Sequence, residues 1–549
     1  MPQFRRDNLI SFVTAHTTEA GGHAEAATIR IQKSFRQHMR DMDVKQRAFS
    51  RFDDEAIELI RRYTEGPASE LYQLPMASKA RLVLHFDINK TVLMADRAQG
   101  ASSACVVNML LSECAWGRLE AGPQWVPVGR LATDRPSNDP QLMSYRSYLD
   151  SFLLPFRAGS GPEVERHNTD VKNQRQAFKR KFTEPGEPGH MFRGVFEQLK
   201  VALQLPAECV QKGKALGGGM GKLFASGERH LLPSFFNLLR QMHAQGREFT
   251  LVFRTFGADV AEVVEEMNAF AIGQHPCYPE VRMDGSHGCG TDLRMAMPAS
   301  TGAFFRSSSK PDGTMLLMGA SAEVMDAKAL SAESLQAAEA SGSGTLLEAF
   351  EDIHHEVHRR AVQGNRALAL RDYYPFWKHR NERSRAGKLL LLDPDDHRTI
   401  QIFFDDNIGH TAAHIVDARD VRNGAPLGFK DLAGRHVFKV EPLNAILDPQ
   451  YFVRAVHGCV MAVLRERSHV PHNTAAENAG TRLPPHNGST LGANGGALLP
   501  LTQRGGGGTS TPGRRLAQVA NTSRRARELW SIVNERLVAM IRVRNAIAN

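Results

Sequence analysis

Residues 81–91 of the chain read RLVLHFDINKT. The segment Leu82–Phe86 is short and mostly apolar, which predicts a strand buried in a parallel sheet. Asp87 follows this strand directly, and open α/β sheets bind their ligands at the carboxyl ends of the strands. An aspartate in that place can attack phosphorus and form an aspartyl phosphate. Such a site requires a metal ion, because an anionic nucleophile and an anionic phosphate repel each other.

A second stretch repeats the pattern of an apolar strand that ends in polar residues. Phe249–Arg254 predicts a strand that ends at Thr255, and the helix expected after Gly257 carries apolar residues at helical spacing. The hydroxyl of Thr255 and the free NH groups near Gly257 would bind a phosphoryl oxygen at the start of that helix. Strand and helix alternate here, which indicates an α/β fold with a parallel sheet.

A third strand is expected to end in two adjacent carboxylates. Thr399–Phe404 lacks the alternation of a half-exposed strand and therefore suits a central strand that is covered on both faces. Asp405 and Asp406 terminate it. One of these carboxylates would bind Mg²⁺ while its neighbour orients water.

A lysine is expected to balance this negative charge. Lys388 precedes the apolar segment LLLLDP, and its ammonium would neutralise both Asp87 and the transferring phosphoryl group. Lys378, in YYPFWKHRN, is a competitor. Lys388 is favoured because it lies closer along the chain to the strand that ends at Asp405.

Four stretches, in this order, resemble the four motifs of the haloacid dehalogenase-like (HAD-like) phosphohydrolase superfamily: LHFDINKT, TLVFRTFG, GK before LLLLDP, and IFFDDN. The resemblance covers residues 78–96, 230–272 and 386–455. It implies a Rossmannoid parallel sheet with helices on both faces and a bound Mg²⁺ ion. The roles that it implies are Asp87 as the nucleophile, Thr255 and Lys388 as phosphate stabilisers, and Asp405 or Asp406 as a metal ligand.

One position departs from the family pattern. HAD-like phosphatases usually carry a second aspartate two residues after the nucleophile as general acid and base, and here that residue is Asn89. Asparagine cannot supply a proton, although its backbone carbonyl could still bind magnesium. The expected function is magnesium-dependent hydrolysis or transfer of a phosphoryl group, with a phosphorylated small molecule or a phosphoprotein as the substrate. The alternative is a catalytically weak or inactive HAD-like protein that acts as a calmodulin-binding regulatory or scaffold protein.

The calmodulin alternative depends on the two end segments. In AATIRIQKSFRQHMR, the residues Ile31, Gln32, Arg36 and Arg40 resemble the IQ motif, a helix that docks calmodulin or a calmodulin-like light chain. The last segment contains RRARELWSIVNERLVAMIRVR, a basic amphipathic pattern that also suits a calmodulin target. In both segments, an amphipathic helix packed on the core is the competing interpretation.

These patterns divide the chain into a HAD-like core in three pieces, two large mixed insertions and two helical extensions. The first insertion resembles a cap domain, and the two insertions would set substrate choice. A low-complexity stretch near the end cannot bury enough apolar surface to order itself. The expected regions are a helical amino-terminal extension with the IQ-like motif (1–75), the core (76–96, 230–275 and 386–465), the cap-type insertion (97–229), a second insertion (276–385), a disordered linker (466–513) and a basic amphipathic helix (514–549).

Composition narrows the class of protein further. The 549 residues are 42% hydrophobic and 23% charged, as in globular proteins, and no apolar run is long enough to cross a bilayer. The first residues lack the apolar core of a secretory signal, so a cytoplasmic location is expected. The net charge of +9 would favour acidic partners, but no groove-reading motif or array of stacking aromatics predicts nucleic-acid binding.

Overall fold

The computed structural model describes residues 80–469, except 96–100, 121–123, 133–138, 140, 258, 287–290, 308–312, 328 and 363–366. The chain separates into two compact units, and all described residues belong to the unit Tyr72–Ala479. The predicted amino-terminal extension with its IQ-like motif, nearly all of the predicted linker and the carboxyl-terminal amphipathic helix lie outside the described residues. Within the described part of the chain, no helix is long and apolar enough to span a membrane.

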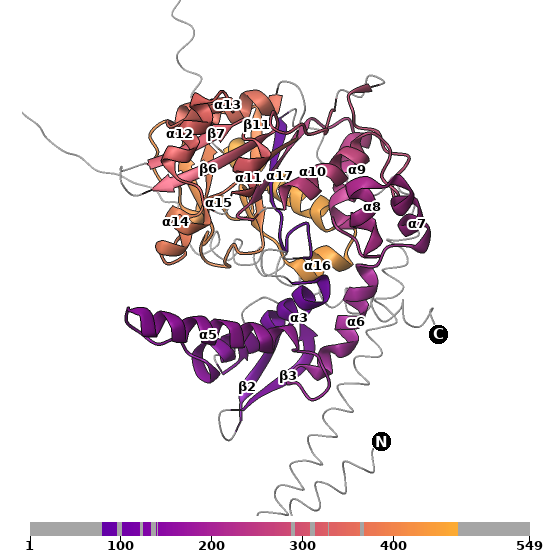
Figure 1. Cartoon of the computed structure of the whole chain (residues 1–549), viewed down its shortest axis with the longest axis vertical. Coiled ribbons are helices and arrows are strands. Elements are labelled where there is room, and N and C mark those ends of the chain that lie inside the picture. Colours follow the sequence, from indigo (N-terminus) through magenta and orange to yellow (C-terminus); the bar gives the residue numbers. More distant parts are fainter. Residues whose placement is uncertain are drawn as a thin grey trace, which may run out of the picture. The chain divides into compact units, whose positions relative to one another are not determined.

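The centre of this unit is a mainly parallel eight-stranded sheet (Figure 1). Neighbouring strands run parallel from β13 through β11, β1, β5 and β9 to β6, whereas β7 and β8 extend the sheet antiparallel at one edge. In sheet order the strands are β13 (Val437–Lys439), β11 (Thr399–Asp405), β1 (Arg81–Asp87), β5 (Phe249–Thr255), β9 (Ala367–Arg371), β6 (Thr301–Ser307), β7 (Gly313–Met318) and β8 (Thr345–Leu347). The mixed α/β class and the parallel central sheet agree with the sequence analysis.

One face of the sheet is covered by helices α9 (Pro233–Ala244), α10 (Val260–Ala271), α16 (Pro442–Leu447) and α17 (Tyr451–His469). Alternate residues of β1 point to this face, as a strand requires. Phe86 packs edge-on against Phe235 of α9 and Phe452 of α17, with ring centroids 5.1 and 5.3 Å apart. The β1 side chains that point to this face are completely buried by the helices.

The opposite face carries the remaining β1 side chains. Val83 and Val252 pack there against Ile353 of α13 (Phe350–Val362) and Leu389 of β10 (Lys388–Leu392). The segment KLLLL thus forms a strand, but it pairs with β12 (Val416–Asp420) in a separate two-stranded sheet and not within the central one. Because both faces of β1 are covered, its nearly continuous apolar sequence is explained.

The second predicted insertion, residues 276–385, differs from the expectation. It contributes β6, β7, β8 and β9 to the central sheet, and β9 pairs directly with β5. The strand β9 has only five residues, and two of them, Ala367 and Ala369, are small, so its pattern in the sequence is weak. The remaining elements here and nearby are α11 (Ala322–Asp326), α12 (Ala332–Ala340), α14 (Tyr374–His379), a 3₁₀ turn (Ser384–Ala386) and α15 (Phe429–Leu432).

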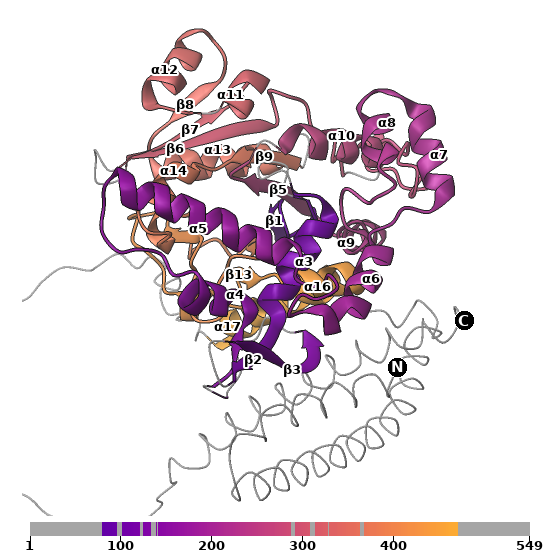
Figure 2. The ribbon, with the colours of Figure 1, turned by 60° about the horizontal axis from the view of Figure 1, so that its bottom comes forward.

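We call the first predicted insertion, residues 97–229, the cap region, and its described residues contribute no strand to the central sheet. It has its own antiparallel sheet, in the order β3-β2-β4, and a set of helices visible in Figure 2. Its elements are α3 (Ser103–Cys114), β2 (Ala115–Leu119), β3 (Trp125–Ala132), β4 (Met143–Ser144), α4 (Tyr145–Tyr148), a π-helical turn (Leu149–Leu153), α5 (Pro162–Arg180), a 3₁₀ turn (His190–Phe192), α6 (Arg193–Ala202), α7 (Ala207–Leu216) and α8 (Gly218–Ala225).

Candidate active site

The site forms where the order of the strands reverses. From β1 the chain continues to β5 on one side of the sheet and later adds β11 on the other side, which makes the carboxyl ends of β1 and β11 a topological switch point. Phe86 pairs with Phe404 in parallel register, so the next residue of each strand, Asp87 and Asp405, lies at the same level. Because side chains alternate between the two faces along a strand, both carboxylates point toward the face of the sheet on which β10 packs.

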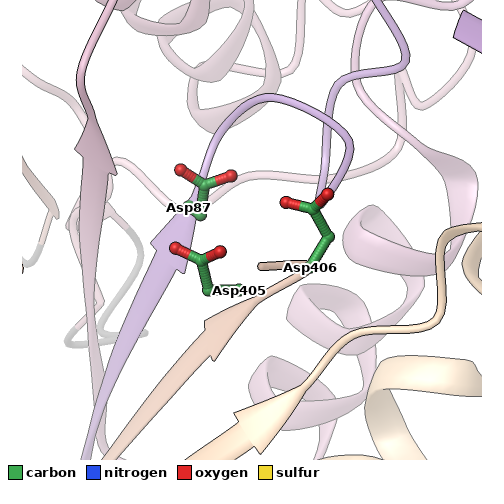
Figure 3. A group of neighbouring side chains, drawn as sticks. All are labelled: Asp87, Asp405 and Asp406. Atoms are coloured by element: carbon green, nitrogen blue, oxygen red, sulfur yellow. The ribbon is translucent and has the colours of Figure 1, made fainter. Parts of the chain in front are cut away.

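Three carboxylates meet at this edge of the sheet (Figure 3). Asp87, Asp405 and Asp406 each offer one oxygen, and these oxygens all lie within 4.8 Å of one another. Thr91 joins the two turns, because its hydroxyl donates to Asp87 Oδ2 at 3.3 Å and accepts the backbone NH of Asp406 at 3.2 Å. The Asp405 side chain is fixed by the backbone NH of Asn407, which donates to its Oδ1 at 2.8 Å.

The cation of the site is Lys388, the first residue of β10. Its ammonium forms an ion pair with Asp87 and donates to Asp405 Oδ2 at 2.8 Å. The Phe256 ring lies 5.1 Å from Lys388 Nζ, and the lysine is almost completely buried. Lys378, the competing lysine, is exposed at the end of α14. Of the two lysines, Lys388 is therefore the one that contacts Asp87.

Burial makes the negative charge of the site costly. It raises the pKa of Asp87 well above its usual range, against the opposing effect of Lys388 and with the help of Asp405 and Asp406. Burial and the neighbouring Asp405 also raise the pKa of Asp406 to about 7. The pKa of Lys388 is lowered by burial, but Asp405 and Asp87 outweigh this effect and raise it overall. One ammonium does not balance the charge of three carboxylates, so a further cation could bind here, and clustered carboxylate oxygens are the ligands that Mg²⁺ prefers.

The loop after β5 lies beside the turn after β1. Thr255 ends β5 and is buried. A side chain at Gly257 would come within 3.4 Å of Thr255 Oγ1 and 3.7 Å of Asn89 Nδ2. The NH of Gly257 is not free, however, because it donates to Thr255 Oγ1 at 2.8 Å. The prediction of free NH groups is corrected at this residue: a local bond from the backbone to a threonine hydroxyl uses the donor.

Asn89 has a partner that the sequence analysis missed. Its side-chain Nδ2 donates to Asp259 Oδ2 at 2.9 Å, and Asp259 is buried. The following residue, Lys90, has a φ of 62°, which belongs to a tight turn. Asp259 precedes α10, where an aspartate looks like an ordinary helix cap, yet its side chain makes no capping hydrogen bond. The Asp259 side chain therefore accepts a hydrogen bond from Asn89 and does not cap the helix.

The cap region adds charged residues near the carboxylates, and these were also not predicted. Arg146 of α4 pairs with Glu113 of α3 at 3.0 Å. Glu113 raises the pKa of Arg146, and Asp150 and Asp406 add to the increase. Lys179 of α5 is buried, and burial together with Arg146 lowers its pKa to about 8. Isolated charges in a mixed segment carry no periodic signal, so only their packing reveals the group.

No family model matches the chain, and neither does any curated protein or any solved structure. The fold and the site define an α/β protein with a candidate metal site at the carboxyl ends of its central strands.

Proposed function

We propose that the chain is a magnesium-dependent phosphohydrolase or phosphotransferase of the HAD-like superfamily, with a Rossmannoid core and the cap region as its substrate-facing part. The observation that carries the proposal is the meeting of Asp87, Asp405, Asp406 and Lys388 at one switch point of the sheet. An aspartate beside a buried cation, with two further carboxylates that could help to hold a metal ion, suits phosphoryl transfer to a carboxylate.

The roles are those that the family resemblance implies, and the contacts of Lys388 with Asp87 and Asp405 support them. Mg²⁺, held by Asp87, Asp405, Asp406 and the Asn89 carbonyl, would offset the repulsion between nucleophile and phosphate. Asp87 attacks phosphorus, the bond to the leaving oxygen breaks, and an aspartyl phosphate forms. Lys388 neutralises Asp87 and the transferring group, and the hydroxyl of Thr255 binds a phosphoryl oxygen. Water or an acceptor hydroxyl then takes the phosphoryl group and releases Asp87.

The substrate is an anion of the expected class, a phosphorylated small molecule or a phosphoprotein. Arg146 of the cap region supports this choice, because its positive charge interacts with Asp406, and the positive charge of Lys179 lies close enough to interact with Arg146. Residue 89 cannot protonate a leaving group, so esters with acidic leaving groups are expected to react fastest. The site would thus discriminate by the leaving group as well as by charge.

The test is hydrolysis of p-nitrophenyl phosphate by the purified full chain with and without MgCl₂. Wild-type protein should release phosphate only with magnesium. The matched Asp87→Asn variant, which keeps the shape of the side chain, should lose the activity. Equal rates for the two proteins would exclude Asp87 as the nucleophile and remove the basis of the proposal.

A second candidate function is favoured by Asn89, which replaces the acid and base of active relatives in the family pattern. In this case the chain is a weak or inactive member that binds calmodulin through the IQ-like motif. Calcium-dependent capture of the full chain on immobilised calmodulin should then be lost in an Ile31→Glu variant, with Arg36 and Arg40 unchanged. Failure of wild-type protein to bind would discard this candidate.

A further inference from the structure

Lys179, near the end of α5 in the cap region, is a buried lysine whose ammonium has no ion-pair partner among the described residues. The residue is only 8% exposed. Burial lowers its pKa to about 8, and the neighbouring charge of Arg146 adds to this effect, so the ammonium still carries its charge at pH 7. Because removing a charge from water is costly, buried charges are normally paired. An unpaired buried ammonium is therefore a candidate binding site for an anion from outside the chain.

Lys179 belongs to a group of charged residues around Glu113 of α3, the helix on which α5 packs (Figure 2). Arg146 of α4 pairs with Glu113 at 3.0 Å and lies 3.7 Å from Asp150, and its side chain is half-exposed. Although burial raises the pKa of Glu113, four neighbouring cations outweigh this effect and lower it overall. These cations are Arg146, Lys90, Lys179 and Lys439. Glu113 and Asp150 cannot neutralise all four, so the group keeps an excess of positive charge.

This group lies beside the candidate metal site. Lys439, at the end of β13, donates from Nζ to the backbone carbonyl of Asp406 at 2.9 Å. Lys90 stands in the turn after Asp87; burial raises the pKa of Asp406, and Lys90 opposes this rise. Lys90 is also one of the charges that lower the pKa of Lys179, where burial is the largest cause. The charges of α5 and of the turn after the nucleophile therefore act on each other across the boundary between the cap region and the core.

We propose that Lys179 and Arg146 bind a second acidic group of the substrate, a phosphate or a carboxylate that is separate from the phosphoryl group transferred to Asp87. The inference rests on the proposed function, and it narrows the substrate class to phosphate esters that carry two acidic groups. A desolvated ammonium is a strong partner for an anion, and the half-exposed guanidinium can donate two parallel hydrogen bonds to it. Lys388 serves the transferring group, so the two ends of the substrate have separate cations.

The test measures the binding of small phosphate esters to the full chain by isothermal titration calorimetry in MgCl₂. The probes are the bisphosphates of linear α,ω-alkanediols from ethanediol to hexanediol, and each is compared with the monophosphate of the same diol. Alkyl esters are chosen because no acid at position 89 protonates their leaving groups, so they react slowly during the titration. In wild type, at least one bisphosphate should bind about tenfold or more tightly than its monophosphate, as for an added charge-assisted hydrogen bond. Carboxyalkyl phosphates of the same lengths distinguish a site for a carboxylate from a site for a phosphate.

The variants separate the buried ammonium from its surroundings. Lys179→Met should lose most of the preference for the second acidic group, and it should melt no lower than wild type, because methionine keeps the apolar stem and needs no counter-ion. Lys172→Met, at an exposed lysine of the same helix, is the matched control and should keep the wild-type preference. Glu113→Gln should act in the opposite direction: Arg146 loses its competing partner, so bisphosphates should bind about threefold more tightly.

The outcomes separate the two proposals. If wild type hydrolyses p-nitrophenyl phosphate but binds no bisphosphate or carboxyalkyl phosphate more tightly than the monophosphate, only this inference is overturned. A Lys179→Met variant with the full preference of wild type, or weaker binding by Glu113→Gln, overturns it as well. If wild type does not hydrolyse p-nitrophenyl phosphate and yet shows a preference that depends on Lys179, the proposed function fails and the anion site remains.

Discussion

Replacing Lys388 by methionine would leave Asp87 and Asp405 without the ammonium that both contact. Methionine keeps the length and the apolar part of the side chain, so the change mainly removes the charge. Both carboxylates are buried, and removing one partner of a buried ion pair costs about 3–5 kcal/mol. We expect Lys388→Met to lower the free energy of unfolding by this amount when magnesium is absent.

The expected change in melting temperature follows from the size of the unit. Unfolding entropy is about 2.1 cal/mol/K per residue, or about 0.8 kcal/mol/K for the roughly 360 described residues. A loss of 3–5 kcal/mol therefore lowers the melting temperature by about 4–6 °C. Magnesium at about 100 times its dissociation constant would return about 2.7 kcal/mol, or about 3 °C.

The assay is thermal unfolding of the full chain, followed by circular dichroism with and without MgCl₂. Lys378→Met, at the exposed lysine of α14, is the matched control and should melt like wild type in both conditions. The melting temperature of Lys388→Met should depend on magnesium more than that of wild type, because no ammonium competes for the carboxylates. An unchanged melting temperature, or equal losses in the two lysine variants, would refute the ion-pair reasoning.

Two further changes test the neighbourhood of α10. Although burial raises the pKa of Glu266, hydrogen bonds with His230 and His275 outweigh this and lower it to about 2. The ionised Glu266 side chain therefore stabilises the fold by about 3 kcal/mol above pH 4.5, and this stabilisation is lost as the pH falls toward 2. Urea unfolding should show that the difference in free energy of unfolding between wild type and Glu266→Gln shrinks over that range. In Gly257→Ala, the new methyl would meet Asp259 Oδ2 at 2.7 Å, so we expect phosphatase activity to fall and the free energy of unfolding in urea to drop by about 1–3 kcal/mol, the usual cost of overpacking. A difference in stability between wild type and Glu266→Gln that persists at pH 2 would contradict the first expectation, and full activity of Gly257→Ala would contradict the second.

The strands that carry Asp87, Thr255 and Asp405 could be predicted because their signal is local. Each is a short apolar run that ends in a polar side chain, and the rule that ligands bind at strand ends requires no knowledge of the partners. The burial of β1 on both faces was readable for the same reason. Lys388 was predicted as the balancing cation, but its place at the start of a separate small sheet was not.

The parts that were missed depend on pairing between distant segments. Asn89 and Asp259 are 170 positions apart, and no local sequence pattern links them. The strand Ala367–Arg371 has only five residues, two of which are alanine, so its place beside β5 became visible only through the hydrogen-bonded register. The pairing of Arg146 with Glu113 likewise arises from packing within the cap region.

The central position of β1 has a consequence for synthesis on the ribosome. Leu82 pairs with Phe249 on one side and with Ile400 on the other, so both neighbours of this strand emerge long after it. Until then, an apolar strand with free backbone groups on both edges is open to pairing with other chains. A nascent chain stopped before β11 would hold Asp87 without its acidic companions, and it should bind chaperones and aggregate more readily than the finished protein.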